Sequence, residues 1–455
     1  FLMNRVGDVG LALAIFILFS KLGTTQYTEV FSRIGELDSA TILALTLLLL
    51  LGACGKSGQF PLQSWLPDAM EGPTPVSALI HAATMVTAGV YLIARSFPIY
   101  DASQDGRLVV VIIGAVTLLI GSIIGCAYDD IKKVLAYSTV SQIGYMFLAV
   151  GLGPVGYALG IMHLLTHGFF KAGLFLGAGS VMHAMNDQVD IRRFGGLAKY
   201  MKITWLTFMM GWLAIIGIPP LSGYFTKEPI IAAAFERGDW TSWLFGGAAL
   251  LGAGLTAFYM TRLFVLTFHG PKRWTDDQHP HESPRVMWIP LVLLAIGSVA
   301  AGVLMRTSVV DWLNPVFAGA QTAAHHESVM PHWLINVLGI AVTVVGAGFA
   351  WALFSRGTAL APQPAGPLVT AARHNLYTDA FNEIVFEKPG RWLTRALVYV
   401  DSRGVDGVVN GLAALVGGGS GRLRRLQTGF VRSYALSMLA GGVLVLGALL
   451  AVRLG

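Results

Sequence analysis

The chain has 455 residues, of which 55% are apolar and only 12% charged, and its net charge is +6. A soluble domain usually has about 45–50% apolar and about 25% charged residues, so this chain has too few charges to cover a soluble globule of its size. The composition excludes a soluble enzyme, a disordered chain and a nucleic-acid-binding protein. It predicts an all-α polytopic membrane protein, with lipids and no nucleic acid as partners, whose helices pack through glycine and alanine.

Apolar runs long enough to cross a bilayer follow one another along the chain. A span needs about 20 apolar residues, and we expect about 11 spans. In chain order they are 6–22, 41–54 with a broken continuation to 70, 76–93, 108–127, 134–152, 157–181, 203–235 with a break at 219–220, 243–268, 286–304, 333–354 and 434–452. Because the chain starts at Phe1 and its first residues resemble the middle of a protein, we expect further spans ahead of it.

The charges in the loops predict an orientation. If successive loops alternate between the two sides, one side receives more lysines and arginines, chiefly in 132–133, 192–202 and 272–285. The side richer in loop Lys and Arg is usually cytoplasmic, so we expect these loops to face the cytoplasm.

The stretch 374–429 fits no span. Apolar residues recur at helical spacing from Trp392 to Leu415, and arginines lie between and after them. This pattern predicts an amphipathic helix along the membrane surface, with a break at the glycine run 417–421. Such a helix serves either as an interfacial anchor for the last span or as a brace against neighbouring subunits.

Lysines lie beside two predicted helix breaks. Pro61 lacks an N–H and interrupts the helix that carries Lys56, and the proline pair at 219–220 interrupts the segment ahead of Lys227 and Glu228. Broken helices at membrane depth line protein or water, so these groups are expected in polar cavities, and their recurrence suggests paired structural repeats. The alternatives are a lysine that extends to the membrane surface at the first site and a helix end at the interface at the second.

His163, His167 and Lys171 recur every four residues within one apolar run. Four residues along a helix rotate the side-chain direction by a full turn plus about 40°, so all three side chains share one face. Histidine changes charge near neutral pH and burial favours loss of a lysine's proton, so the column has the geometry of a proton relay. Core histidines with satisfied hydrogen bonds are the alternative. A metal site is not expected, because neither Glu nor Cys accompanies the histidine pair.

His81 lies between the two lysine sites in the sequence, with Thr84 and Thr87 in helical register. We expect it to act as a further relay group rather than as a bonded core residue. Arg5 and Asp8 are spaced for an ion pair on one helix.

A polar stripe in the run 134–152 carries either water molecules or hydrogen bonds between helices. Its members are Ser138, Ser141, Gln142 and Tyr145. The charged stretch 129–133 is expected to be a solvated turn. Cys54 and Cys126 lie in apolar runs and are expected to be small buried hydrophobic residues.

Three stretches carry a resemblance to a known family. Residues 72–86, 130–145 and 163–172 resemble the signature of the antiporter-like subunits of respiratory complex I, the NADH–quinone oxidoreductase. Residues 375–379 and 427–435, on either side of the surface helix, resemble the subunit L branch of that family.

The resemblance implies a proton channel of two inverted helical repeats with two broken transmembrane helices, followed by a C-terminal lateral helix on the cytoplasmic side of a bacterial-type inner membrane. Its translocation residues would be Lys56, His81, His163, His167, Lys171, Lys227 and Glu228. Arg5 and Asp8 would be a charge pair beside the channel, and Thr84, Thr87, Ser141, Gln142 and Tyr145 are polar groups suited to a water wire. In the family, Lys56 pairs with a glutamate on the preceding helix, and no such glutamate occurs here, so we expect Lys56 to be unpaired.

The predicted organisation has four parts. Residues 1–306 form the channel core, 307–373 an extra transmembrane helix with its loops, 374–429 the lateral helix and 430–455 a C-terminal anchor. No dinucleotide-binding motif or cysteine cluster occurs, so flavin, iron–sulfur clusters and quinone are expected in partner subunits of the complex, contacted in part through the lateral helix. The competing functions are a cation/proton antiporter component and a structural strut without transport.

Overall fold

The computed structural model describes residues 1–236, 240–320, 328–356 and 366–454. Within these ranges ten helices are long and apolar enough to cross a membrane, and the apolar helix Lys202–Ile216 is shorter. The predicted all-α polytopic fold is therefore confirmed. Parts of the predicted region 307–373, together with Gly455, lie outside the described residues.

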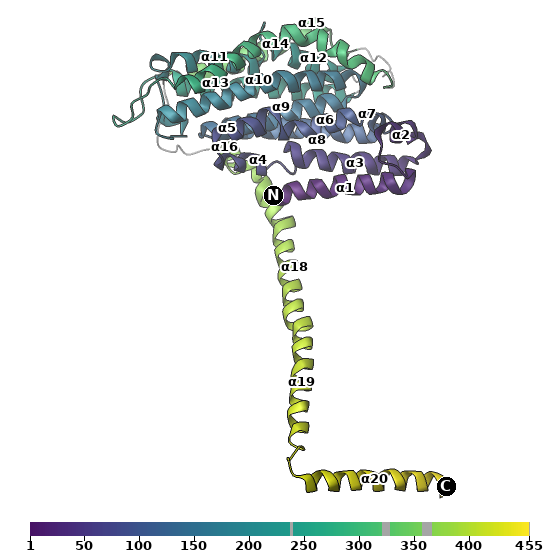
Figure 1. The fold of residues 1–455 in the computed structure, drawn as a ribbon. Helices are drawn as coiled ribbons and strands as arrows, with labels where there is room; N and C mark the ends of the chain where they lie inside the picture. Colours follow the sequence, from purple (N-terminus) through teal and green to yellow (C-terminus); the bar gives the residue numbers. More distant parts are fainter. Residues whose placement is uncertain (237–239, 321–327, 357–365, 455) are drawn as a thin grey trace. The chain divides into compact units, whose positions relative to one another are not determined.

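The chain divides into two compact units, Phe1–Asp379 and Ala380–Gly455. In the first unit, α1 and α3 lie along one edge, α14 and α15 lie along the opposite edge, and α8, α9 and α10 lie between them (Figure 1). The first half of this unit contains α1 (Leu2–Leu22), α2 (Tyr27–Ser32), α3 (Ser39–Ser57), α4 (Trp65–Asp68), α5 (Thr74–Ala78), α6 (Ala88–Arg95), α7 (Phe97–Asp101), α8 (Gln104–Ala127), α9 (Ile131–Gly151) and α10 (Pro154–Ala184). The second half contains α11 (Lys202–Ile216), α12 (Tyr224–Phe235), α13 (Trp240–Phe268), α14 (Arg285–Phe317), α15 (His332–Phe354) and α16 (Pro367–Arg373), and α17 (Thr378–Asn382) crosses the boundary between the units.

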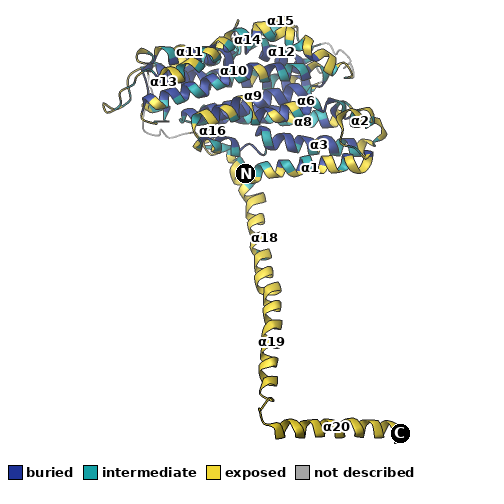
Figure 2. Ribbon diagram, viewed as in Figure 1, coloured by how far each residue is buried: buried dark blue, intermediate teal, exposed yellow. Residues whose placement is uncertain are grey.

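Helix α9 forms the centre of the first unit (Figure 2). Its apolar window is completely buried, in contrast to the outer helices α1 and α15. Glycines allow its backbone to approach α8 closely, because a Cβ added to Gly144 would lie 2.5 Å from the Leu118 nitrogen and one added to Gly114 would lie 2.4 Å from the Leu148 nitrogen. Small residues at such crossings are typical of helix packing in membranes, and here they leave the polar side chains of α9 facing protein rather than lipid.

Two spans are broken where the sequence predicts breaks. Helix α3 ends at Ser57, where Gly58 has a φ of 56°, and α11 ends at Ile216, where Gly217 has a φ of 85°. Both glycines adopt the left-handed conformation that closes helix C-termini at little cost. The chain becomes helical again at α4 and α12.

The predicted span 76–93 is confirmed as Thr74–Arg95, but it is not one regular α-helix. After α5 comes a π-helical turn, Leu79–Ala83, which carries His81, and regular helix resumes only at α6 after a break at Thr84. π-helical turns are rare and often mark functional sites, and hydrophobicity alone does not reveal them because they leave the apolar pattern intact.

The second unit contains one long helical stretch followed by α20. The stretch comprises a π-turn at Glu383–Glu387, α18 (Lys388–Tyr399), a second π-turn at Val400–Val405 and α19 (Asp406–Arg424), and α20 covers Val431–Leu454. The predicted break at 417–421 is wrong, since α19 continues through these glycines. Each interior glycine costs only about 0.5–1 kcal/mol, whereas starting a new helix requires a costly nucleus. Apart from the half-buried Asn382 and Ala396, the described residues of this unit are exposed (Figure 2).

Candidate functional site

The first charged site lies between α1 and α3. Lys56 Nζ is 3.0 Å from Asp8 Oδ1, and Arg5 Nη1 is 3.2 Å from Asp8 Oδ2. The predicted Arg5–Asp8 pair is therefore present. The expectation of an unpaired Lys56 is wrong, because its ammonium forms an ion pair with Asp8.

Glycines bring this pair together. A Cβ on Gly7 would lie 2.9 Å from the Cα of Gly55, so these two helices touch backbone to backbone one residue before Asp8 and one before Lys56. The side chains of Lys56 and Asp8 are 39% and 30% exposed in the described chain. The close approach of the two backbones, rather than any local sequence feature, decides that Lys56 reaches this carboxylate.

The central column of α10 is fully buried. His163, His167 and Lys171 have no exposed surface, and the imidazole centroids of the two histidines are 6.3 Å apart. The structure therefore places the three groups on one protein-facing side, as the spacing predicts.

The polar stripe of α9 connects this column to the second broken helix. Lys171 Nζ donates to Ser138 Oγ at 2.5 Å, and His163 Nε2 lies 3.3 Å from Gln142 Oε1. His163 Nδ1 lies 2.7 Å from the hydroxyl of Thr226, the residue before Lys227. Sequence reasoning missed Thr226, whose only signal was its place beside a lysine that follows a helix break.

Lys227 lies in the first turn of α12, and its side chain extends back to the end of α11 at the second helix break. Its ammonium donates to the Ile215 carbonyl at 2.7 Å and lies 5.2 Å from the centre of the Tyr145 ring. The break leaves this carbonyl at the negative end of α11, which favours a cation there. Lys227 is buried and the adjacent Glu228 is partly exposed, so the two groups face different surroundings.

Two histidines have incomplete hydrogen bonding. Among the described residues, neither His81 nor His167 makes a direct side-chain hydrogen bond, although both are completely buried. His81 instead lies against Phe175, with ring centroids 5.1 Å apart. Buried polar groups nearly always find partners, so bridging water molecules are the physical explanation that fits such groups.

The buried amides of Gln59 and Gln63 repeat this pattern just after Lys56. Both side chains retain polar atoms without a protein partner among the described residues. Sequence reasoning missed both residues, although glutamines beside a predicted break in an apolar run are a usable signal. They therefore place further buried polar atoms, without a protein partner among the described residues, at the first helix break.

The structure does not gather all the predicted polar groups. Thr84 is exposed. The hydroxyls of Thr84 and Thr87 each donate to a backbone carbonyl of their own segment. Ser141 instead joins α9 to α8 through the Ser122 hydroxyl at 2.9 Å. The Lys56–Asp8 pair makes no direct polar contact with the central column among the described residues.

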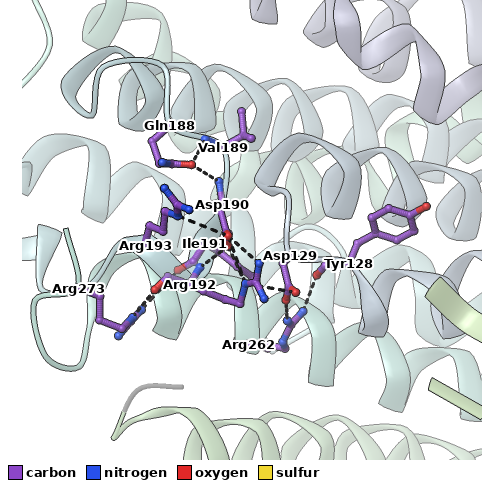
Figure 3. Close-up of polar contacts among 10 residues, drawn as sticks. All are labelled: Tyr128, Asp129, Gln188, Val189, Asp190, Ile191, Arg192, Arg193, Arg262 and Arg273. Carbon is purple, nitrogen blue, oxygen red and sulfur yellow. Dashed lines mark hydrogen bonds and ion pairs between the residues drawn. The ribbon is translucent and has the colours of Figure 1, made fainter. Parts of the chain in front are cut away.

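A charged network ties together the loops at one end of the bundle (Figure 3). Asp129 lies between two guanidinium groups, accepting from Arg262 and lying 3.4 Å from Arg192. Arg192 also binds Asp190 at 2.8 Å. Burial acts to raise the pKa of Asp190, but the side-chain and backbone hydrogen bonds from Arg192 outweigh it and hold that pKa below its usual value.

The prediction of a solvated turn at 129–133 is therefore wrong. Asp130 caps α9 by accepting from the Lys132 and Lys133 nitrogens at 2.8 and 3.0 Å, and the buried Lys132 ammonium donates to the carbonyls of Met70 and Gly72. The turn is a junction between loops because its charges find partners distant in the sequence. Arg262 in α13 was missed since it lies at the end of an otherwise ordinary apolar span.

The segment 375–379 is anchored within the first unit. The Asn375 side-chain oxygen accepts from the hydroxyls of Tyr128 and Tyr137 at 2.9 and 2.7 Å, and Ser64 donates to Asp379. Asn375, Leu376 and Tyr377 all have positive φ, which is uncommon for residues other than glycine. These hydrogen bonds hold the strained turn against the first broken helix and the α8–α9 turn.

A membrane-embedded helix bundle with two broken helices, a lysine at each break and a buried column of titratable groups between them defines an antiporter-like membrane protein. Comparisons with known proteins agree. Residues 1–252 match the family described as NADH:quinone oxidoreductase/Mrp antiporter, TM. The chain belongs to this family, and the predicted family is confirmed.

Relatives cover most of the chain. NADH-quinone oxidoreductase subunit L of Mycobacterium tuberculosis is 57% identical over 100% of this chain and 72% of its own length. NAD(P)H-quinone oxidoreductase chain 5 of Picosynechococcus is 41% identical over 96% of this chain and 71% of its own length.

Solved structures share the fold. A chain of the Mrp complex from Dietzia is 26% identical, with a TM-score of 0.66. The match covers 100% of this chain and 46% of the Dietzia chain. A chain of an archaeal membrane-bound sulfane sulfur reductase has a TM-score of 0.63 at 23% identity, covering 98% of this chain and 75% of its own length.

In the part of the chain that the structure describes, no group of His, Cys, Asp and Glu side chains is arranged to hold a metal ion. The thiols of Cys54, which is buried, and Cys126, which is partly buried, are free.

Proposed function

We propose that this chain moves protons across the membrane as the antiporter-like subunit of an NADH–quinone oxidoreductase in a bacterial-type inner membrane. The observation that carries the proposal is the buried column His163–His167–Lys171, which is hydrogen-bonded to a polar stripe and lies next to a lysine in a helix break. Ionisable groups at membrane depth are costly and rarely serve packing alone. We infer the kind of complex from the names of the relatives, which are subunits of quinone oxidoreductases.

The proposed route starts at Lys56 and passes His81 to the column, and it leaves through Lys227 and Glu228. Asp8 holds the Lys56 ammonium in one state. In the other state Asp8 would keep only its contact with Arg5, so that Lys56 loses its counter-charge and its proton becomes easier to transfer. Water molecules at the unsatisfied nitrogens of His81 and His167 would complete the path between the first site and the column.

Ser141, Gln142, Tyr145, Thr84 and Thr87 are the polar groups proposed to support such water molecules. Gln142 and Tyr145 have the better support, because both contact groups of the route, whereas Thr84 and Thr87 bond to backbone carbonyls. Redox chemistry, with flavin, iron–sulfur clusters and quinone, would belong to partner subunits. The second unit, with its exposed apolar side chains, would contact them in part.

The test is Lys171→Ala in a complex assembled around this chain, with Lys199→Ala, an exposed loop lysine, as the matched control. Proton uptake by inverted membrane vesicles and NADH oxidation are measured together. Loss of most proton uptake in Lys171→Ala, with the control unchanged, is expected. Normal uptake per NADH in Lys171→Ala would contradict the relay.

A second candidate is a cation/proton antiporter component, favoured by the likeness to the chain of the Mrp complex. It predicts that an imposed sodium gradient alone drives proton movement in vesicles that contain this chain. The redox-driven proposal predicts proton movement on addition of NADH without sodium. A structural strut predicts that Lys171→Ala affects assembly only.

A further inference from the structure

A cavity of about 30 Å³ lies beside Lys227 and Glu228, among α12, α13 and α15. Its polar wall is formed by Tyr224, Asn336 and Thr343 together with these two charged residues. A water molecule needs roughly 10–15 Å³ and two or more polar partners, and this cavity offers both.

The cavity lies between one face of α15 and one face of α12. On α15, Asn336, Gly339, Ile340 and Thr343 line it, and residues three and four apart share one face of a helix. The Thr343 hydroxyl is 3.4 Å from the Ile216 carbonyl at the helix break, which marks the inner end of this face.

The facing side of α12 is formed by Tyr224, Lys227, Glu228 and Ile231. A direct hydrogen bond joins the two helices here, because Asn336 Nδ2 donates to the Tyr224 hydroxyl at 2.8 Å. Both residues line the cavity, so this bond crosses it between α12 and α15.

The same two faces carry a charged pair one turn farther out. Glu236 follows α12 directly and His332 begins α15, and His332 Nε2 is 3.5 Å from Glu236 Oε1. His332 lies four residues before Asn336, which puts it on the same face, and it is within electrostatic reach of Glu228. Its side chain is 66% exposed, so this end of the stripe meets the surface.

Helix α15 lies beyond the residues that match the family, which end at 252. It is nevertheless held tightly, because a Cβ on Gly346 would lie 2.4 Å from the Gly254 carbonyl of α13. Its polar face is therefore fixed against Lys227 and Glu228. The outer end lies on the side with fewer loop lysines and arginines, the expected outer face.

We propose that α15 completes the proton outlet, with the Tyr224–Asn336 hydrogen bond as its gate and the Glu236–His332 pair as its mouth. The inference rests on the proposed function and adds residues to it. Asn336 and Tyr224 position water for transfer from Lys227 and Glu228 to the surface, while His332 and Glu236 exchange protons with the aqueous phase.

Asn336→Leu removes the amide and fills the cavity with apolar atoms, and Tyr224→Phe removes only a hydroxyl. Val337→Leu, on the exposed side of α15, is the matched control. In vesicles with the assembled complex, Asn336→Leu is expected to lose most proton uptake while NADH oxidation persists. Tyr224→Phe is expected to lose less, and Asn336→Gln to recover uptake.

The outcomes separate this inference from the proposed function. Normal uptake in Asn336→Leu with loss in Lys171→Ala would overturn the α15 outlet alone. Normal uptake in both variants would overturn the proposed function.

A labelling measurement covers the case in which Asn336→Leu fails to assemble. Asn336→Cys, with Cys54 and Cys126 replaced by alanine, is expected to react with a membrane-impermeant thiol reagent added on the side of Glu236. Absence of reaction from that side would overturn the outlet whatever the pumping result.

Discussion

The three lysines of the proposed route differ in their shortest polar contact. Lys56 faces a carboxylate, Lys171 a hydroxyl and Lys227 a backbone carbonyl. A carboxylate holds an ammonium most firmly, whereas neutral oxygens stabilise it without a counter-charge. The three sites therefore differ in the charge that their nearest partner presents to the ammonium group.

The carboxylate of Asp190 gives a residue-scale prediction about pH. Because its pKa is lowered in the folded chain, its contribution to stability is fully present above the unfolded value, about 3.9, and is lost as the pH falls through the lower folded value. Asp190→Asn should lower the free energy of unfolding at pH 7 by about 1 kcal/mol, since the Asp190–Arg192 pair is partly exposed.

Unfolding in mixed micelles at several pH values checks this prediction. The difference between native chain and variant should shrink below about pH 4. Asp277→Asn, at an exposed loop position on the same side, is the control and should change little. A difference that persists unchanged at low pH would show that the carboxylate charge is not the cause.

Glycines decide where helices touch. Gly7 with Gly55 and Gly346 with Gly254 bring backbones into contact at the two ends of the proposed route, because a Cβ on Gly7, Gly55 or Gly346 would meet a backbone atom of the partner glycine. In a membrane the hydrophobic effect gives little drive for helix association, so such packing selects the partner and the rotation of each helix.

Helix α15 offers an element-scale test of this packing. Gly346→Val must push α15 away from α13, because the atom in its path is a backbone oxygen. Overpacking of this kind costs roughly 1–3 kcal/mol. Gly348→Val, where nothing lies within 4 Å, is the matched control. Melting of the purified complex should fall for Gly346→Val only, and equal melting of the two variants would contradict the close contact.

At the scale of the whole molecule, the two ends of the bundle differ in charge. The loops around Asp129, Asp190, Arg192 and Arg273 carry the network of Figure 3 and belong to the cation-rich side. Such a side is normally retained in the cytoplasm during insertion. The proposed mouth at Glu236 and His332 belongs to the opposite side.

Single-cysteine labelling tests this topology. With Cys54 and Cys126 replaced by alanine, Lys272→Cys should react with an impermeant reagent only in inverted vesicles, and Arg33→Cys only in right-side-out vesicles. Both positions are outside the spans and accessible in the described chain. The reverse pattern would invert the orientation and with it the direction of the proposed outlet.

Local sequence patterns were enough to predict the helices and the ionisable groups that lie at membrane depth. Span lengths, the two breaks and the one-sided column on α10 follow from hydrophobicity, proline and glycine, and helical period, all of which act within one or two turns. A bulge that leaves the apolar pattern intact, as at Leu79–Ala83, and a glycine run that remains helical, as in α19, escape such local rules.

The partner of each charged or polar group depends instead on how the helices pack together. Asp8 for Lys56, Thr226 and Gln142 for His163 and Arg262 for Asp129 come from helices whose mutual rotation no local period fixes. That rotation depends on which backbones can approach closely, a property of pairs of helices rather than of any one segment. Sequence thus places the charges along each helix, and packing chooses what each charge meets.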